Sequence, residues 1–367
     1  MSASAPAPAT PVELAPAAAC DLVGRGVVLL DVRDAPELAV GMAEGARHVP
    51  LCELERRAPE LEPDRSRVIL LICASGRRSR QGAERLRALG YERAMSVMGG
   101  LERWRADGLP VARSPGVVTD VDVERYARQL TLPEVGLDGQ RRLRDARVLL
   151  VGAGGLGSPA ALYLAAAGVG HLTLVDDDRV ERSNLHRQVL HGDADTGRLK
   201  IDSGAATLQA LNPTVEVLRV ERRLTAANAR TLLEGAHVVI DGADNFATRY
   251  AVNDACIALA IPDVQGSVFR FEGQVTVLWP AAPGGGPCYR CLYPEAPPPE
   301  LAPSCGEAGV LGVVPGVIGL LQAAETLKLL LGVGSPLVGR MLQYDALRGS
   351  FDEFDVARAP ACQACAR

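Results

Sequence analysis

Two kinds of hydrophobic pattern alternate along the first third of the chain. Apolar runs at 27–32 ("VVLLDV") and 67–72 ("RVILLI") are typical of buried strands, whereas 79–90 ("SRQGAERLRALG") has helical spacing and closes at Gly90. Strands that alternate with helices predict a parallel α/β sheet. The pattern fades over 112–120, a segment with Pro115 and Gly116, so we place a domain boundary near residue 118.

The rest of the chain repeats this alternation on a larger scale. It opens with a helix containing "ERYARQL", and we then expect a strand at 147–151, a helix at 156–168, and strands at 171–175, 214–220 and 237–241. This order predicts a Rossmann-like, doubly wound sheet. Beyond residue 262, "QGSVFRFEGQVTVLW" alternates like a hairpin, which predicts an antiparallel extension. The apolar stretch 310–334 is interrupted by Pro315, Glu325 and Lys328, which favours a buried helix over a membrane span.

Composition narrows the function classes. The chain has 367 residues, enough for two domains, and its formal net charge of −5 does not suit a protein that binds nucleic acid or an anionic membrane. The first residues have no secretion-signal pattern. We therefore expect a cytoplasmic protein, in which nine cysteines serve metal binding or catalysis in preference to disulfides.

The segment "VGAGGLG" places Gly152, Gly154 and Gly157 between a strand and a helix. Glycines there allow a tight turn and close approach of the backbone to an anionic phosphate at the helix N-terminus. Asp176 follows about 20 residues later, where an acid binds ribose hydroxyls. Taken alone, this pattern indicates NAD or FAD, or a glycine turn that binds no ligand.

The residues that follow favour MgATP over a nicotinamide. Asn184 and Arg187 come soon after Asp176, and Lys200 follows in "TGRLK". The segment "DGADN" then ends the strand at 237–241, at a sheet edge where ligands of such folds bind. Cations can offset the charge that develops on a triphosphate, and a carboxylate can hold its metal ion.

Two cysteine pairs indicate a metal site. "CYRC" contains Cys288 and Cys291, and "CQAC" contains Cys362 and Cys365. Two such pairs can close one tetrahedral thiolate site, which would be structural because protein atoms fill all four positions. The alternative is two unrelated pairs or a redox motif.

Cys73 ends an apolar strand and is followed by Gly76 and the arginine-rich start of a helix. A helix N-terminus with Arg77 and Arg78 nearby stabilises an anionic sulfur, either a thiolate or a persulfide. A buried cysteine at a strand end is also common without any function.

Residues 120–367 resemble the ubiquitin-activating-enzyme-like adenylyltransferases of molybdopterin and thiamine biosynthesis, of the MoeB/ThiF type. The resemblance rests on "RYARQ", "VGAGGLGSP", "VDDDRVERSNLHRQ", "DGADN", "PCYRC", "SCGEAGVLGVVPGVIG" and "CQAC" in this order. It implies activation of the C-terminal glycine of a ubiquitin-like sulfur carrier, a homodimer and a structural Zn2+. It implies an ATP site formed by Gly155, Asp176, Ser183, Asn184, Leu185, His186, Arg187, Lys200, Asp244 and Asn245.

Two further roles follow from the same resemblance. Arg128 would reach the ATP of the other subunit, and Cys305 would be a resolving or acyl-accepting thiol. His186 stands where the family often has Gln.

Residues 10–113 resemble a single-domain rhodanese. The resemblance rests on "VLLDVRDAPELAVGMAEGARHVPL", "CASGRRS" and "VMGGLERWRADGLPV". It makes Cys73 the persulfide carrier and Ser79 its partner at the helix start. Met42, Glu44 and Ala74 depart from the family pattern, which leaves the sulfur donor open. We thus expect a tail at 1–10, a rhodanese-like domain at 11–113, a linker at 114–121 and an adenylyltransferase domain at 122–367.

Together the halves predict an enzyme that adenylates a carrier ending in Gly-Gly and then transfers sulfur from a Cys73 persulfide, or from thiosulfate through it, to give a thiocarboxylate. The alternatives are an adenylyltransferase whose rhodanese unit only docks partners, and an NAD- or FAD-dependent oxidoreductase. Molybdopterin, thiamine, cysteine, tRNA-thiolation and siderophore pathways all remain open.

Overall fold

The computed structural model describes residues 12–112, 120–297 and 308–366. The chain divides into two compact units, Met1–Leu137 (unit 1) and Asp138–Arg367 (unit 2). The expected linker at 114–121 lies mostly outside the described residues. Helices α5 (Asp120–Arg125) and α6 (Ala127–Leu130) belong to unit 1, where Tyr126 and Leu130 pack against Val40.

Unit 1 contains a parallel five-stranded sheet in the order β1-β6-β5-β2-β4. The strands are β1 (Glu13–Leu14), β2 (Val28–Asp31), β4 (Ala46–His48), β5 (Ile69–Ile72) and β6 (Ala94–Val97). Strands β3 (Met42–Ala43) and β7 (Val111–Ala112) form a separate antiparallel pair, and η1 (Ala35–Val40) is a 3-10 turn.

Both faces of this sheet are covered, which explains the continuous apolar runs in the sequence. Helices α2 (Leu54–Leu61) and α3 (Arg77–Ala88) pack on one face, where Leu30 and Leu71 are buried. On the other face, α4 (Gly100–Ala106) packs beside α1 (Pro16–Gly24), with Trp104 at the centre. The helix expected at 79–90 begins two residues earlier and ends at Ala88, because Gly90 takes a left-handed conformation with φ +94°.

Unit 2 is built on an eight-stranded sheet in the order β10-β9-β8-β11-β12-β13-β14-β15. Its parallel part comprises β8 (Arg147–Val151), β9 (His171–Val175), β10 (Glu216–Val220), β11 (Val238–Asp241) and β12 (Asp263–Phe269). Strands β13 (Glu272–Leu278), β14 (Arg340–Asp345) and β15 (Ser350–Asp355) extend it in antiparallel fashion, as the alternating sequence predicts.

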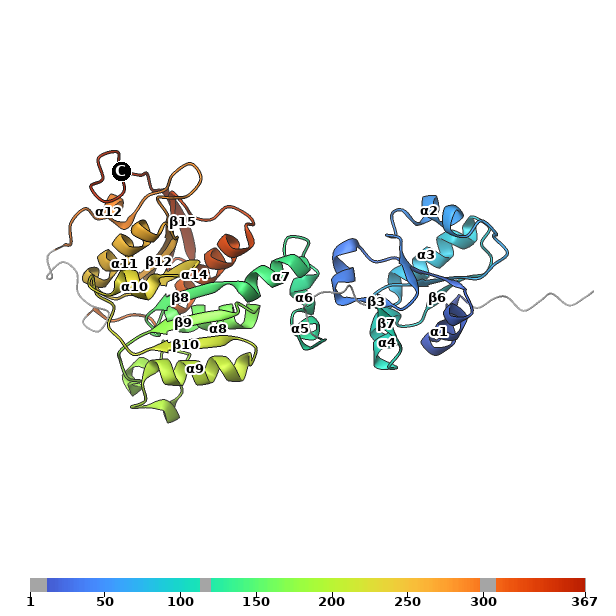
Figure 1. Cartoon of the computed structure of the whole chain (residues 1–367), viewed down its shortest axis with the longest axis horizontal. Coiled ribbons are helices and arrows are strands. Elements are labelled where there is room, and N and C mark those ends of the chain that lie inside the picture. Colours follow the sequence, from blue (N-terminus) through green and yellow to red (C-terminus); the bar gives the residue numbers. More distant parts are fainter. Residues whose placement is uncertain (1–11, 113–119, 298–307, 367) are drawn as a thin grey trace, which may run out of the picture. The chain divides into compact units, whose positions relative to one another are not determined.

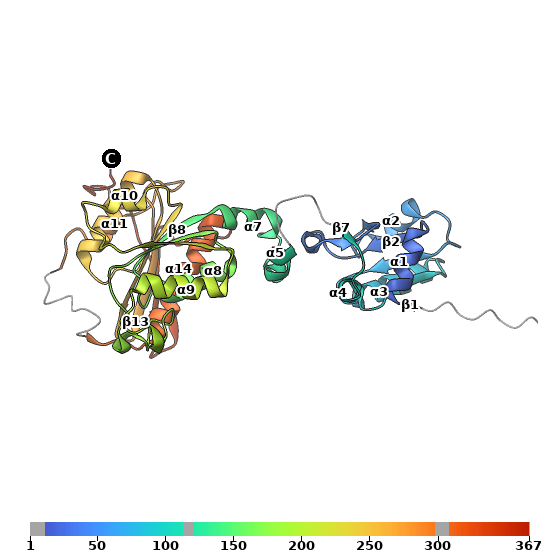
Figure 2. The same cartoon turned by 60° about the horizontal axis from the view of Figure 1, so that its bottom comes forward.

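Helices cover both faces of the parallel part. Figures 1 and 2 show α10 (Ala229–Leu233) and α11 (Phe246–Leu259) on one side, and α8 (Gly157–Ala167), α9 (Lys200–Leu211) and α14 (Val313–Leu331) on the other. Helix α7 (Gly136–Asp145) precedes β8, and the short helix α12 (Tyr289–Leu292) follows β13. This arrangement confirms the doubly wound prediction and brings the carboxyl ends of the parallel strands to one edge.

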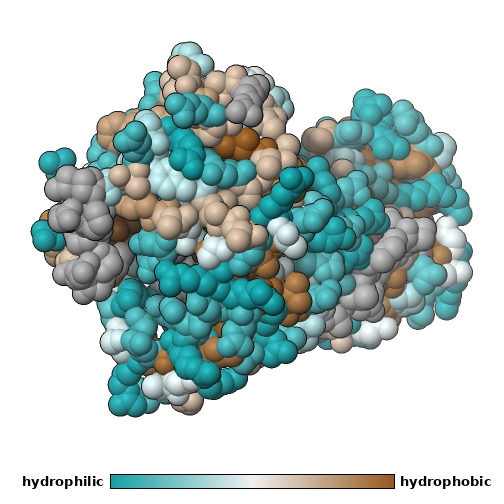
Figure 3. Space-filling view, turned by 60° about the vertical axis from the view of Figure 1, so that its left-hand side comes forward, coloured by the Kyte–Doolittle hydropathy of each residue, from teal (hydrophilic) through white to brown (hydrophobic). Residues whose placement is uncertain are grey.

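Helix α14 is long and apolar enough to cross a membrane by length and composition alone. In the fold it packs against α8 and strands β11, β12 and β13, and it buries Ile318 and Gln322 completely. The Gln322 side chain donates to the carbonyls of Asp241 and Val264, both at 2.8 Å. The apolar composition of α14 therefore reflects its place in the core. On the face drawn in Figure 3, apolar residues form separate patches among hydrophilic ones.

Candidate functional sites: a nucleotide cradle, a cysteine cluster and a thiol loop

The glycine loop joins β8 to α8, and its glycines are required sterically. Gly152 has φ +91°, a region that L side chains rarely adopt. A Cβ on Gly157 would lie 1.9 Å from the carbonyl oxygen of Gly152, and one on Gly155 would lie 3.1 Å from Pro315 of α14. The loop is thus held in a tight turn that brings backbone N–H groups to the start of α8, as an anion cradle requires.

Asp176 lies at the end of β9 and contacts this loop directly. Its Oδ2 accepts the Ala153 N–H at 2.8 Å, and its Oδ1 accepts the Asp178 N–H at 2.8 Å. Burial raises the pKa of Asp176, while the nearby Lys200 charge and the two N–H donors oppose that rise. Each oxygen keeps a free lone pair, which suits a carboxylate that accepts ribose hydroxyls.

Lys200 is buried at the start of α9, with only 5% of its surface exposed. Its Nζ lies 2.7 Å from Asp178 Oδ2. The Lys200 ammonium is therefore held beside the Asp176–Asp178 turn, where it can contact a phosphate while it stays paired with Asp178. The oxygens of the consecutive aspartates at 176–178 lie close enough together to hold a metal ion. However, Asp178 is paired with Lys200, and Asp176 accepts backbone N–H groups, which disfavours a metal site there.

Residues 183–187 form one local hydrogen-bonded segment around the 3-10 turn η2 (Arg182–Asn184). Arg187 donates to Asn184 Oδ1 at 2.8 Å and to the Ser183 carbonyl at 3.3 Å, and its Nη1 is 2.8 Å from His186 Nε2. The carbonyl of His186 packs against Gly312, where a Cβ would lie 2.3 Å away. Arg187 also reaches the glycine loop, because its side chain lies 3.6 Å from the Cβ position of Gly155.

His191 belongs to this site although the sequence did not single it out. Its Nε2 is 2.9 Å from the Ala153 carbonyl oxygen, and its Nδ1 is 2.9 Å from Ser203 Oγ. Burial lowers the pKa of His191, and Lys200 acts in the same direction, so the ring is neutral near pH 7. The backbone of Ala153 is thus held on both sides, because its N–H donates to Asp176 and its carbonyl oxygen contacts His191.

The "DGADN" segment follows β11 at the same sheet edge. Asn245 caps α11 by accepting the Thr248 N–H at 2.9 Å, and its amide donates to the exposed Asp244 at 3.2 Å. Asp241, which the sequence placed at the ligand edge, is instead 1% exposed, and its Oδ1 accepts the Ala243 N–H at 2.8 Å. Burial raises its pKa to about 6. Asp244 is therefore the carboxylate available to a metal ion here, and Asp241 shapes the loop.

The structure does not test two of the predicted residues. Arg128 is an exposed residue of α6 in unit 1, so its expected role in a partner's ATP site stays a prediction. Cys305 lies outside the described residues.

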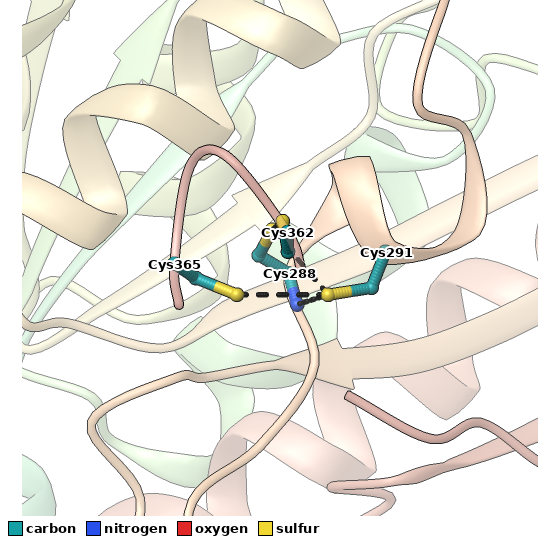
Figure 4. Close-up of side chains that lie close together, drawn as sticks. All are labelled: Cys288, Cys291, Cys362 and Cys365. Carbon is teal, nitrogen blue, oxygen red and sulfur yellow. Dashed lines mark hydrogen bonds between the residues drawn. The ribbon is translucent and has the colours of Figure 1, made fainter. Parts of the chain in front are cut away.

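The four paired cysteines come together in unit 2, as Figure 4 shows. The sulfur of Cys288 lies 3.8 Å from that of Cys291 and 3.6 Å from that of Cys362, and Cys291 is 3.6 Å from Cys365. A tetrahedron with Zn–S bonds of about 2.3 Å has edges of about 3.8 Å. The donor set and its spacing therefore fit a zinc ion bound by four thiolates, and burial raises the pKa of the Cys288 thiol.

The third candidate is the loop between β5 and α3 in unit 1. Cys73 is 1% exposed, and its Sγ accepts the Gly76 N–H at 3.2 Å and the Ser79 hydroxyl at 3.4 Å. Gly76 has φ +91° at the start of α3. The sulfur is therefore surrounded by hydrogen-bond donors at a helix N-terminus, as the sequence predicts.

Contacts that the sequence did not reveal hold this loop in place. The N–H groups of Leu101 and Glu102, at the start of α4, donate to the carbonyls of Cys73 and Ala74 at 2.8 and 3.0 Å. A Cβ on Gly100 would lie 2.3 Å from the Cys73 carbonyl oxygen, so only glycine fits.

The arginines at the loop differ in their partners. Arg78 makes two 2.6 Å hydrogen bonds to the Glu37 carboxylate. Although burial opposes the effect, these bonds lower the pKa of Glu37. Arg77 is exposed, whereas the charge of Arg78 is close enough to Cys73 to interact with it.

A parallel sheet with a glycine turn, an acid at the next strand end and a buried lysine is typical of a nucleotide-binding α/β protein, here joined to a second α/β domain with a buried thiol at a helix start. Residues 126–364 match the model of the ThiF family, and residues 16–107 match the rhodanese-like domain. The chain therefore belongs to the ThiF family and carries a rhodanese-like domain.

Named relatives agree with this assignment. Over 249 residues the chain is 52% identical to the sulfur carrier protein adenylyltransferase of Thermus thermophilus, which covers 67% of this chain and 92% of that protein. It is 48% identical over 304 residues to the adenylyltransferase and sulfurtransferase MOCS3 of Sus scrofa, which covers 82% of this chain but only 65% of the relative. Escherichia coli MccB has the same fold, with 22% identity, a TM-score of 0.59 and coverage of 67% of this chain and 73% of that one.

Proposed function

We propose that this chain uses MgATP to adenylate the C-terminal glycine of a ubiquitin-like sulfur carrier ending in Gly-Gly, and then delivers sulfur to that glycine from a persulfide on Cys73. The observation that carries the proposal is that one chain holds both the Asp176–Lys200 nucleotide cradle and the donor-lined thiol of Cys73. The named adenylyltransferase and sulfurtransferase relatives support both halves.

In the first half-reaction, a carboxylate oxygen of the carrier attacks the α-phosphorus of ATP and pyrophosphate leaves. Arg187 and Lys200 offset negative charge on the phosphates, and in a homodimer Arg128 of the partner subunit adds a third cation. Asp244 would hold Mg2+, which neutralises the triphosphate when bound. The backbone N–H groups of the glycine loop orient the phosphates, and Asp176 accepts the ribose hydroxyls.

In the second half-reaction, the terminal sulfur of the Cys73 persulfide attacks the carbonyl carbon of the acyl-adenylate, and AMP leaves. The product is an acyl disulfide between the carrier and Cys73. A thiol, either Cys305 or an external dithiol, then attacks the Cys73 sulfur. The thiocarboxylate leaves, and Cys73 ends in a disulfide with that thiol. The external dithiol then reduces this disulfide and is itself oxidised to a disulfide. Cys73 is reloaded by a persulfide donor, which leaves as a thiol, or by thiosulfate, which leaves as sulfite.

The finer assignments belong to the same proposal. Zn2+ in the cysteine cluster would be structural, because four thiolates fill its coordination sphere and tie Cys362 and Cys365 to α12. We also place the enzyme in the cytoplasm as a homodimer. Adenylation alone, with unit 1 as a docking module, is the second candidate, favoured by the loop departure at Ala74. Membership of the ThiF family weighs against an NAD- or FAD-dependent oxidoreductase.

Intact-mass spectrometry tests the proposal. A purified carrier ending in Gly-Gly is incubated with this protein, MgATP, thiosulfate and a dithiol. We expect the mass change for exchange of one oxygen by sulfur with the wild type and with Cys52→Ala, an exposed cysteine that carries no motif, and no change with Cys73→Ala.

The remaining outcomes separate the candidates. Conversion by Cys73→Ala at the wild-type rate would reduce unit 1 to a docking module. If no carrier is adenylated and no pyrophosphate is released, the adenylation proposal is wrong.

A further inference from the structure

The short helix α12, which follows Cys288 and contains Cys291, is fixed on one face of α11. The Tyr289 N–H donates to Asn253 Oδ1 at 2.7 Å, and Arg290 donates to the Asp254 carboxylate at 2.8 and 3.1 Å. The Arg290 guanidinium also lies over the Tyr250 ring, 4.5 Å from its centroid. The helix within the cysteine cluster therefore moves with α11.

The same helix α11 begins at the nucleotide edge. Asn245 caps it, and the residues just before that cap form the strand-end segment that carries Asp244. One rigid helix of 14 residues thus has the cysteine cluster on its side and the metal-binding carboxylate at its N-terminus. A displacement of α12 can reach Asp244 if a side chain connects α12 to the segment that carries Asp244.

Arg249 makes this connection. Its Nε donates to the Ala243 carbonyl, inside the strand-end segment, at 3.1 Å, and its Nη1 lies 3.5 Å from the Tyr289 hydroxyl. Its guanidinium also lies over the Phe246 ring, 5.6 Å from the centroid. A planar guanidinium can serve all three partners at once, whereas an ammonium cannot.

Two buried carboxyls, those of Asp241 and Asp263, also interact by charge with Arg249. Asp241 and Asp263 are each 1% exposed on neighbouring strands, and Asp241 Oδ2 and both Asp263 oxygens have no hydrogen-bond partner in the described residues. Burial raises the pKa of both carboxyls, and the positive charge of Arg249 opposes this rise. The Arg249 guanidinium is therefore close enough to both buried carboxyls to interact with them by charge, in addition to its hydrogen bonds.

We propose that Arg249 is a positioning residue for the "DGADN" segment, and that Tyr289 of the cysteine cluster holds Arg249 in place, so that the metal cluster supports nucleotide binding through one side chain. The proposal rests on the proposed function, because that function makes the segment a MgATP ligand. In this role Arg249 acts through its contacts with Ala243 and Tyr289 and not by binding the nucleotide.

The test measures binding of a non-hydrolysable ATP analogue with Mg2+ to the full chain by calorimetry, together with zinc content and thermal unfolding. We expect Arg249→Met to weaken binding of the analogue about tenfold or more, and Arg249→Lys to weaken it less. Tyr289→Phe should weaken binding about threefold. All three variants should keep the wild-type zinc content. Arg290→Met is the matched control, since it removes an arginine of α12 that stacks on Tyr250 and pairs with Asp254, both in α11 and away from the strand-end segment. Its affinity should stay within about twofold of the wild type.

A double-mutant cycle separates a relay through Tyr289 from independent effects. If Tyr289 acts through Arg249, the variant with both substitutions binds the analogue no more weakly than Arg249→Met alone. Additive losses would overturn the link to the cysteine cluster. Unchanged binding by Arg249→Met, or an equal loss by Arg290→Met, would overturn the positioning role.

The binding readout also keeps this proposal distinct from the proposed function. A wild type that binds the analogue but adenylates no carrier contradicts the proposed function alone. A wild type that does not bind the analogue contradicts both.

Discussion

His191 Nε2 lies 2.9 Å from the carbonyl oxygen of Ala153, at the centre of the glycine loop. On the other side of the ring, Nδ1 is 2.9 Å from Ser203 Oγ of α9, the helix that begins with Lys200. One buried imidazole thus joins the two elements that supply the cradle with N–H groups and with a cation.

Replacing His191 by Phe keeps an aromatic ring but removes both hydrogen bonds. We expect MgATP to bind about five- to thirtyfold more weakly, because losing buried hydrogen bonds costs about 1–2 kcal/mol and leaves the Ala153 carbonyl with its weaker contact to the Ser158 hydroxyl at 3.2 Å. His191→Gln, which can still donate to the Ala153 carbonyl, should recover part of the loss. His171→Gln, at an exposed histidine paired with Glu216, is the control and should bind MgATP normally. Wild-type affinity in His191→Phe would remove His191 from the site.

His191 also sets a direction for the dependence of stability on pH. Burial lowers its pKa in the folded state, whereas the unfolded chain titrates near the ordinary value of about 6.5. The unfolded state then binds more protons below that pH, so this group's contribution to the free energy of unfolding is present above about pH 6.5 and is lost as pH falls. Thermal unfolding between pH 5 and 7.5 should show a shallower decline on acidification in His191→Gln than in the wild type.

Gly100 tests how the thiol loop is held. Alanine there combines φ +58° with a Cβ 2.3 Å from the Cys73 carbonyl oxygen, so the backbone of the loop must move. We expect a loss of about 2–4 kcal/mol in the stability of unit 1 and a strong loss of sulfur transfer from thiosulfate to cyanide.

Gly108→Ala is the matched control for Gly100→Ala, because Gly108 has φ +69° but nothing within 4 Å of its Cβ position. It should cost only about 1–2 kcal/mol, the strain of the left-handed backbone, and keep its activity. Equal effects of the two substitutions would show that strain, and not the contact with Cys73, matters.

The cysteine cluster predicts one Zn2+ per chain. Metal analysis of purified wild type should find it, and Cys362→Ser should reduce both the zinc content and the unfolding temperature, because the second cysteine pair then no longer ties the chain to α12. Cys256→Ser is a control with a cysteine that is also buried, 3% exposed, but lies outside the cluster, and its zinc content should not change. A full zinc content in Cys362→Ser would contradict the four-thiolate site.

The sequence predicted much of this fold because short-range patterns determined it. The apolar runs became β2, β5 and β8, and the glycine loop formed a turn in which Gly152 and Gly157 cannot be replaced without strain or a clash. The cysteine pairs were predicted for the same reason, since their spacing restricts the metal geometry.

Contacts between distant segments could not be predicted in this way. His191 stands next to a glycine in a loop, and nothing in its neighbourhood indicates that it meets Ala153 from another strand end. Asp241 was expected at the ligand edge because it ends a strand, yet the turn to Ala243 buries it. The hydrogen-bond partners of Arg249 come from the segment that follows β11 and from α12, which are brought together only by the tertiary fold.

Asp263 carries the clearest prediction about stability. Burial and the neighbouring Asp241 raise its pKa well above the ordinary value, so the folded protein keeps a proton that the unfolded chain releases near pH 4. Stability associated with this group is therefore full at low pH and is lost as pH rises toward the folded-state pKa.

Asp263→Asn should consequently stabilise the protein at pH 8, because the amide has a similar shape and cannot ionise. We expect a gain of about 1–2 kcal/mol, which corresponds to about 2–8 °C in unfolding temperature for a domain of this size, and a smaller decline of that temperature between pH 5 and 8. Asp352→Asn, on the exposed strand β15, should change neither quantity. If Asp263→Asn lowers the unfolding temperature at pH 8, the ionised carboxylate must be stabilised by Arg249 more strongly than burial destabilises it, and Arg249→Met should then become tolerable only when Asp263 is also replaced.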